Sequence, residues 1–155
     1  MYYYARRYDQ ARYHLARAIE MNPNAEESHR ILGLTLALQG QLEEAERVLR
    51  DALTLPGAGA YAQATLGWVL ARAGKRAETV RLLRGLEAQA RAGYVSPVAF
   101  ATLHLALGDL DRAIEHTERA YRERRGWLAY LAVNPMFDPL REQPWFQALV
   151  KKMRL

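Results

Sequence analysis

The four histidines are the first side chains to consider for chemistry, since imidazole is a common general base and metal ligand. They are His14, His29, His104 and His116. They fall on different predicted helices, and no H-E-x-x-H sequence places two of them on one helical face, as a zinc hydrolase requires. His104 takes an inner position of a recurring helix, so we expect it in the core, whereas His116 is expected on an outer face. The histidines therefore predict neither a metal site nor a general base.

The acidic residues, glycines and serines also lack the spacing of a catalytic motif. Asp109-Leu110-Asp111 has the first acids of a calcium loop but not the later ligands or the glutamate at position twelve. We interpret it as a turn and a helix start. No G-x-x-x-x-G-K phosphate loop and no nucleophile elbow occurs, and the chain has no cysteine. We expect no enzyme, no cofactor and no metal.

The residues that do keep a regular spacing lie in a repeat of 34 residues. The positions that share this step are Gly40, Gly74 and Gly108; Leu32, Leu66 and Phe100; Ala11, Ala45, Thr79 and Ala113; and Ala18, Ala52, Leu86 and Ala120. A period kept in several registers indicates an array of stacked helical units. We divide the single domain 1–155 into a half repeat (1–25), three full repeats (26–59, 60–93 and 94–125) and a tail (126–155).

Each full repeat is predicted to be two helices, with a glycine capping the first in the left-handed conformation. Arg6 takes this turn position in the half repeat. Gly33 lies inside a helix, where glycine costs about 1 kcal/mol relative to alanine, so we expect a neighbouring helix to pass close to it. The tail is broken by Asn134-Pro135 and Asp138-Pro139, and we expect it to cap the open face of the last repeat.

The recurring pattern resembles the tetratricopeptide repeat family, whose signature is W-x2-L-G-x2-Y, then A-x3-F and a proline. The first full repeat reads His29-x2-Leu32-Gly33-x2-Leu36, then Ala45-x3-Leu49 and Pro56. The second reads Gln63-x2-Leu66-Gly67-x2-Leu70, then Thr79-x3-Leu83. The resemblance covers residues 1 to about 125. It implies an all-α fold, a right-handed α-α superhelix, and a non-catalytic scaffold for protein–protein interaction.

The tail is similar to the C-terminal end of bacterial tetratricopeptide arrays, through Gly126-Trp127-Leu128 and Asn134-Pro135-x-Phe137-Asp138-Pro139. Such arrays often follow a protein kinase, a nucleotide cyclase or a DNA-binding region. The resemblance therefore implies the C-terminal piece of a larger bacterial regulatory protein, located in the cytoplasm.

In such a superhelix the first helices line a concave groove, which we expect to hold a peptide or a helix of a partner protein. The predicted groove residues are Arg30, Leu34, Leu38, Tyr61, Trp68, Arg72 and Thr102. Trp68 between Arg30 and Arg72 is the main cluster, because aromatic and arginine side chains are common binding anchors. Two interpretations of Trp68 stay open: it contacts the partner, or it packs between helices. The lysine and asparagine with which some family members clamp a peptide carboxylate are missing from these positions.

Two alternatives come from charge and from the half repeat. The net charge is +5 and almost all of it is arginine, which could suit nucleic acid, although the arginines form no dense run. The half repeat lacks its partner helix, so the apolar face of residues 8–19 is expected to be uncovered and to self-associate. The residues proposed for that contact are Tyr2, Tyr3, Tyr4 and Tyr8. No apolar run approaches the roughly 18 residues of a membrane span, so no membrane partner is expected.

Overall fold

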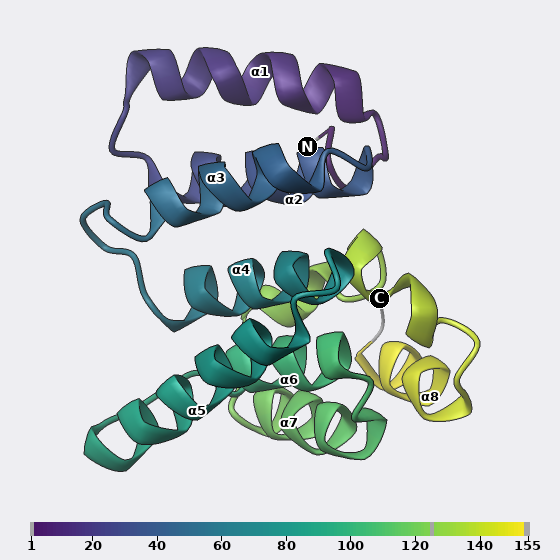
Figure 1. Cartoon of the computed structure of the whole chain (residues 1–155). Coiled ribbons are helices and arrows are strands. Elements are labelled where there is room, and N and C mark those ends of the chain that lie inside the picture. The colour runs from purple at the N-terminus through teal and green to yellow at the C-terminus, as the bar shows by residue number, and fades with distance from the viewer. Residues whose placement is uncertain (1, 125, 154–155) are drawn as a thin grey trace.

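The fold consists of short helices, seen in a computed structural model that describes residues 2–124 and 126–153 (Figure 1). The α-helices are α1 (Tyr8–Met21), α2 (Glu26–Leu38), α3 (Leu42–Ala52), α4 (Ala60–Arg72), α5 (Arg76–Ala92), α6 (Pro97–Leu107), α7 (Leu110–Arg122) and α8 (Pro144–Met153). Two 3₁₀ helices, η1 (Gly126–Tyr130) and η2 (Pro135–Leu140), precede α8. No strand occurs among the described residues, so the all-α prediction is confirmed.

The helices pack in consecutive pairs: α2 with α3, α4 with α5, and α6 with α7. The first helices of the pairs also stack on one another, α2 on α4 and α4 on α6, while α1 lies on α2. The inner residues of neighbouring repeats are thereby removed from water, as Ala45, Leu49 and Leu70 show with at most 1% exposure. This arrangement is the helical solenoid that the 34-residue period predicts.

The turn inside each repeat recurs with the same backbone geometry. Three glycines adopt a positive φ there, at 82°, 78° and 79°: Gly40, Gly74 and Gly108. In the first of these turns the Gln41 amide donates to the Leu36 carbonyl at 2.9 Å, which satisfies an orphan carbonyl at the helix end. Arg6 has a φ of 59°, and the following Arg7 amide donates to the Tyr2 carbonyl at 3.0 Å. Residues 2–6 are therefore the last turn of the half repeat's first helix, although arginine is strained in a conformation that suits glycine.

Gly33 allows the two helices of its repeat to approach closely. A Cβ atom placed on Gly33 would lie 2.5 Å from Cγ of Leu49, a side chain on α3 that is fully buried. The close approach predicted from this interior glycine is confirmed. Gly67 has the corresponding position in α4, but the side chain that fills its space is Leu103 of α6. The glycine of the second repeat therefore serves the contact between repeats.

The tail crosses the concave side of the solenoid instead of stopping at the last repeat (Figure 1). Its α8 lies against α7, where Nζ of Lys152 is 4.9 Å from the centroid of the Tyr121 ring. The segment before α8 enters the same apolar core as the first helices, and Leu131 and Phe137 are at most 1% exposed in it. The expectation of a cap on the last repeat alone was therefore incomplete.

Polar contacts join the tail to the N-terminal turn. The hydroxyl of Tyr3 donates to Oδ1 of Asn134 at 3.0 Å, and both side chains are buried. The guanidinium of Arg6 donates to both carboxylate oxygens of Asp138, at 2.6 and 2.7 Å. Because both charged groups are substantially exposed, this ion pair contributes only about 0.2–1 kcal/mol. Its main effect is to set where the tail crosses.

Candidate protein-binding groove

The residues predicted to line the concave groove divide into buried and accessible sets. Leu34, Trp68 and Thr102 are 2%, 6% and 0% exposed, because side chains of the tail pack over the middle of the concave side. The Thr102 hydroxyl is used within α6, where it donates to the Val98 carbonyl at 2.9 Å. Leu38 is half-buried. These four residues do not present a free surface to a partner in this conformation.

Trp68 packs between helices, which decides between the two interpretations of this residue. Its ring belongs to the core cluster that also contains Leu34 and Phe137. Arg72, one helical turn further along α4, is exposed and places its Cζ atom 4.9 Å from the centroid of the indole ring. The arginine covers the edge of the tryptophan by a cation–π contact. Arg72 is therefore the part of this pair that solvent and a partner can reach.

An open hollow remains at the start of the first helices, between the N-terminal turn and the beginning of the tail. Its volume is about 390 Å³, and its lining residues are Tyr4, Glu27, Arg30, Tyr61, Ser96, Val98, Gly126 and Tyr130. It holds two of the predicted groove residues, Arg30 and Tyr61. The concave face is thus partly filled by the tail and partly open at this end.

Two aromatic contacts shape the hollow. Cζ of Arg30 lies 4.4 Å from the centroid of the Tyr61 ring, which joins α2 to α4. The rings of Tyr4 and Tyr130 stack in parallel, with centroids 4.8 Å apart and an interplanar angle of 8°. This second contact comes from opposite ends of the chain. The walls of the hollow therefore combine aromatic faces with one arginine, the residue types that most often anchor binding partners.

The charge of Arg30 is compensated inside α2. Its guanidinium lies 3.8 Å from a carboxylate oxygen of Glu26 and 3.5 Å from one of Glu27. Burial raises the pKa of the Glu26 carboxyl despite the nearby arginine, and burial likewise raises the pKa of the Tyr4 hydroxyl. Glu27, whose side chain is 76% exposed, can receive a hydrogen-bond donor from a ligand. The hollow offers mixed polarity and is not a site for a bare anion.

Sequence reasoning missed Tyr4, Glu27 and Tyr130 as lining residues of one site. Glu27 was identifiable, because it lies 34 residues before Tyr61 on a first helix. Tyr4 and Tyr130 were not, because their contact depends on the path of the tail across the solenoid. No periodic signal links two residues so far apart in the chain.

The histidines do not form a reactive site. His104 is 3% exposed, which confirms its expected core position. The expectation for His116 was wrong: its ring stacks between Phe100 and His104, with centroids 5.0 and 5.4 Å away, on the inner side of α7. Burial lowers the pKa of both histidines, although Asp109 acts in the opposite direction on His104. In the described part of the chain, no three metal-ligating side chains gather at one point.

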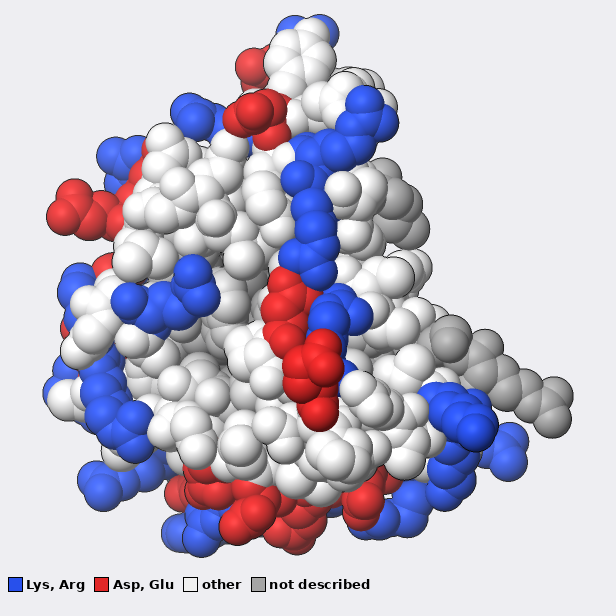
Figure 2. All heavy atoms as spheres, turned by 90° about the vertical axis from the view of Figure 1, so that its right-hand side faces the viewer, with Lys and Arg blue, Asp and Glu red and all other residues white. Residues whose placement is uncertain are grey.

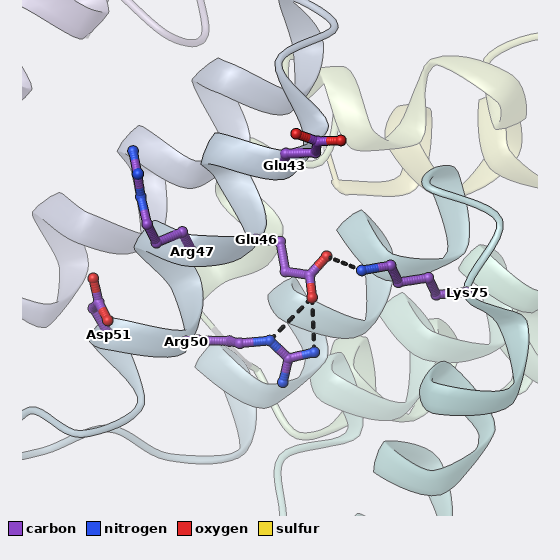
Figure 3. A pocket seen from close by; sticks show the side chains of 6 residues that line it. All are labelled: Glu43, Glu46, Arg47, Arg50, Asp51 and Lys75. Carbon is purple, nitrogen blue, oxygen red and sulfur yellow. Dashed lines mark hydrogen bonds and ion pairs between the residues drawn. The ribbon is translucent and has the colours of Figure 1, made fainter.

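A second hollow, of about 420 Å³, lies between α3 and α5 and is lined by charged side chains (Figure 3). Glu46 binds Arg50 at 2.8 Å and Lys75 at 2.7 Å, and Arg50 also reaches Glu78 at 2.8 Å. Hydrogen bonds from Lys75 and Arg50 hold the pKa of Glu46 below its usual range. Since these charges neutralise one another, the cluster connects neighbouring repeats and leaves no carboxylate poised for acid–base chemistry.

Comparison with protein families agrees with this architecture. The model of the tetratricopeptide repeat family matches residues 1–133. The chain is a tetratricopeptide repeat protein. No curated protein and no solved structure matches it. Within the described ranges, no helix of this tetratricopeptide protein is both long and apolar enough to cross a membrane.

Tetratricopeptide repeats generally mediate protein–protein interaction, and the first helices of this array provide the surface for it. The family match ends at Val133, so η2 and α8 lie beyond it. Those two elements are also the ones that, with Leu131, occupy or close the concave side. In this tetratricopeptide protein the accessible groove is therefore shorter than the number of repeats suggests.

Proposed function

We propose that this protein is a non-catalytic interaction module that binds a short segment of a partner protein in the open hollow of the concave side. The observation that supports this most directly is the combination of Arg30, Tyr61, Tyr4 and Tyr130 around one accessible space. It lies on the face that the first helices form. The tail leaves this end of that face uncovered.

The dimensions of the hollow limit what it can accept. About 390 Å³ lies at the lower end of the roughly 300–1,000 Å³ of small-ligand sites, which suits one or two side chains of a peptide. An apolar or aromatic side chain would pack on Tyr61 and Val98. A backbone or side-chain donor would reach Glu27, while Arg30, already held by two carboxylates, would stack more than attract charge. The proposed ligand is a peptide with an aromatic anchor and a flanking hydrogen-bond donor.

Nucleic-acid binding has less support as an alternative. Many arginines are paired with carboxylates, including Arg6, Arg50, Arg119 and Arg141. On the face where the tail meets the N-terminal turn, blue and red groups alternate along a narrow column on a mostly uncharged surface (Figure 2). A phosphate backbone calls for a continuous basic stripe instead.

The proposal is tested by selecting peptides from a displayed random library against the whole chain and measuring their affinity for variants. Tyr61→Ala should weaken binding by about tenfold or more, because an aromatic anchor in an interface is worth about 1–4 kcal/mol. Tyr61→Phe should retain binding, and circular dichroism checks that both variants are folded. Arg72→Glu, at the other end of the concave side, is the matched control and should have little effect. Loss of binding in Arg72→Glu alone would move the site to the Trp68 end, and equal binding by all variants would remove the concave side from the proposal.

A further inference from the structure

A second, apolar hollow lies at the N-terminal edge of the solenoid, apart from the concave hollow. Its volume is about 200 Å³, and it is lined by Tyr2, Tyr3, Tyr4, Ala11, His14, Leu15 and Ile31. These residues come from the N-terminal turn, from α1 and from α2. The hollow is the space between α1 and α2 that lies in front of residues 2–6.

The other repeats of this chain show what fills the equivalent space. Leu15 is half-buried, whereas Leu49 and Leu83, which lie 34 and 68 residues later, are 0% and 9% exposed. The difference arises because a first helix covers the later leucines; in the first full repeat, Gly33 of α2 lies directly over Leu49. At Leu15 no such helix is present among the described residues.

Residues of α2 and of the N-terminal turn show the same difference. Ile31 is half-buried, whereas its counterparts Thr65 and Ala99 are 0% exposed. Tyr2 is half-buried and has the His14 ring stacked on it, with centroids 4.8 Å apart. Independent positions on three elements therefore mark one vacant helix seat.

We infer that this seat binds an amphipathic helix of a partner protein, oriented like the first helix of a repeat. Its inner face needs a glycine or alanine opposite Leu15, as Gly33 stands opposite Leu49, and apolar residues one turn to either side. Residues 2–6 already form the final turn of that helix. The docked helix therefore ends beside them.

Charge selects the end of the partner helix. Arg7 is exposed at the rim of the seat, with its Cζ atom 5.6 Å from the centroid of the Tyr2 ring. The docked helix brings the negative end of its dipole to this arginine, and acidic residues in its last turn strengthen the contact. The partner is thus a helix with an apolar, small-residue face and acidic residues in its last turn.

A second copy of this chain fits the seat less well. Within the described residues, the first helices α2, α4 and α6 are all packed in their own array. Part of the tyrosine surface expected to self-associate is also already used, because Tyr3 is 4% exposed and bonded to Asn134. Dimerisation is therefore an outcome of the test and not the proposal.

The experiment uses the whole chain and a synthetic helix of known fit, an acetylated peptide with the sequence of Glu26–Thr35, a free C-terminal carboxylate and a staple on its outer face. Binding is followed by fluorescence anisotropy. Leu15→Asp should weaken it by about tenfold or more, as expected when an apolar contact worth about 1.4 kcal/mol is lost. Arg7→Glu, an exposed substitution that leaves the core intact, should weaken it as well. Tyr13→Ala is the control, because Tyr13 is 64% exposed on α1 and does not line the seat.

A peptide with leucine in place of the glycine equivalent to Gly33 should not bind, because its side chain would collide with Leu15. The proposal is overturned if the glycine peptide does not bind at millimolar concentration, or if it binds Leu15→Asp and Arg7→Glu as well as the unchanged chain. Sedimentation equilibrium provides the remaining outcome. A dimer that dissociates in Leu15→Asp would assign the seat to a second copy and overturn the proposal. Tyr61→Ala should leave this binding unchanged, which separates it from the concave hollow.

Discussion

Replacement of Phe137 by alanine should destabilise the whole protein. The phenyl ring is 1% exposed and lies in the core cluster shared by the tail and the first helices. Removing a buried phenylalanine side chain costs about 3–5 kcal/mol, against a total stability of about 5–15 kcal/mol for a domain of this kind. At about 2–4 °C per kcal/mol for a chain of this length, the melting temperature should fall by about 10 °C.

The measurement is urea denaturation followed by far-ultraviolet circular dichroism, which reports the unfolding of all helices together. Val133→Ala is the matched control, since Val133 lies in the same tail segment but is 46% exposed; it should change stability by less than about 0.5 kcal/mol. A loss below about 1 kcal/mol in Phe137→Ala would refute the reasoning, because the ring would then not be packed against the first helices. The concave side would have to be open, and Trp68 would become a binding residue again.

Two further predictions concern polar groups in the core. Burial lowers the pKa of His104 and His116, so the unfolded chain binds more protons; stability should be complete above the ordinary histidine pKa of about 6.5 and be lost as the pH falls below it. His116→Phe should reduce this loss in urea titrations between about pH 7 and 5, and an unchanged slope would contradict the assignment. Asn134→Ala should cost about 1–3 kcal/mol by leaving the buried Tyr3 hydroxyl unpaired. A double-mutant cycle with Tyr3→Phe should give a coupling of about 1 kcal/mol, and additive effects would show that the hydrogen bond contributes nothing.

Much of the fold follows from local rules and was predictable from the sequence. The spacing of Gly40, Gly74 and Gly108 identified the turns, because a left-handed cap favours glycine at each of them. The same spacing assigned Arg6 to a turn without any glycine to mark it. Gly33 indicated a close helix contact for the same steric reason. These inferences succeed because each depends on residues within one repeat or on the step between repeats.

The candidate site was only partly predictable. Arg30 and Tyr61 were identified because a first helix directs the same positions to the concave side in every repeat. Trp68, Leu34 and Thr102 were assigned to the same surface by the same rule, yet they are buried. The rule describes which way a helix face points, but it does not say whether another part of the chain covers that face.

By itself, then, the sequence determined the repeat, its helices and turns, and its membership of a family of interaction scaffolds. Only the tertiary structure decided where the tail lies, and with it which part of the concave side stays open. The contacts that place the tail, Tyr3 with Asn134 and Arg6 with Asp138, join residues more than 130 positions apart. Such pairs carry no period and no local propensity. They form because Phe137 and its neighbours find apolar surface on the first helices, beside the turn that residues 2–6 form.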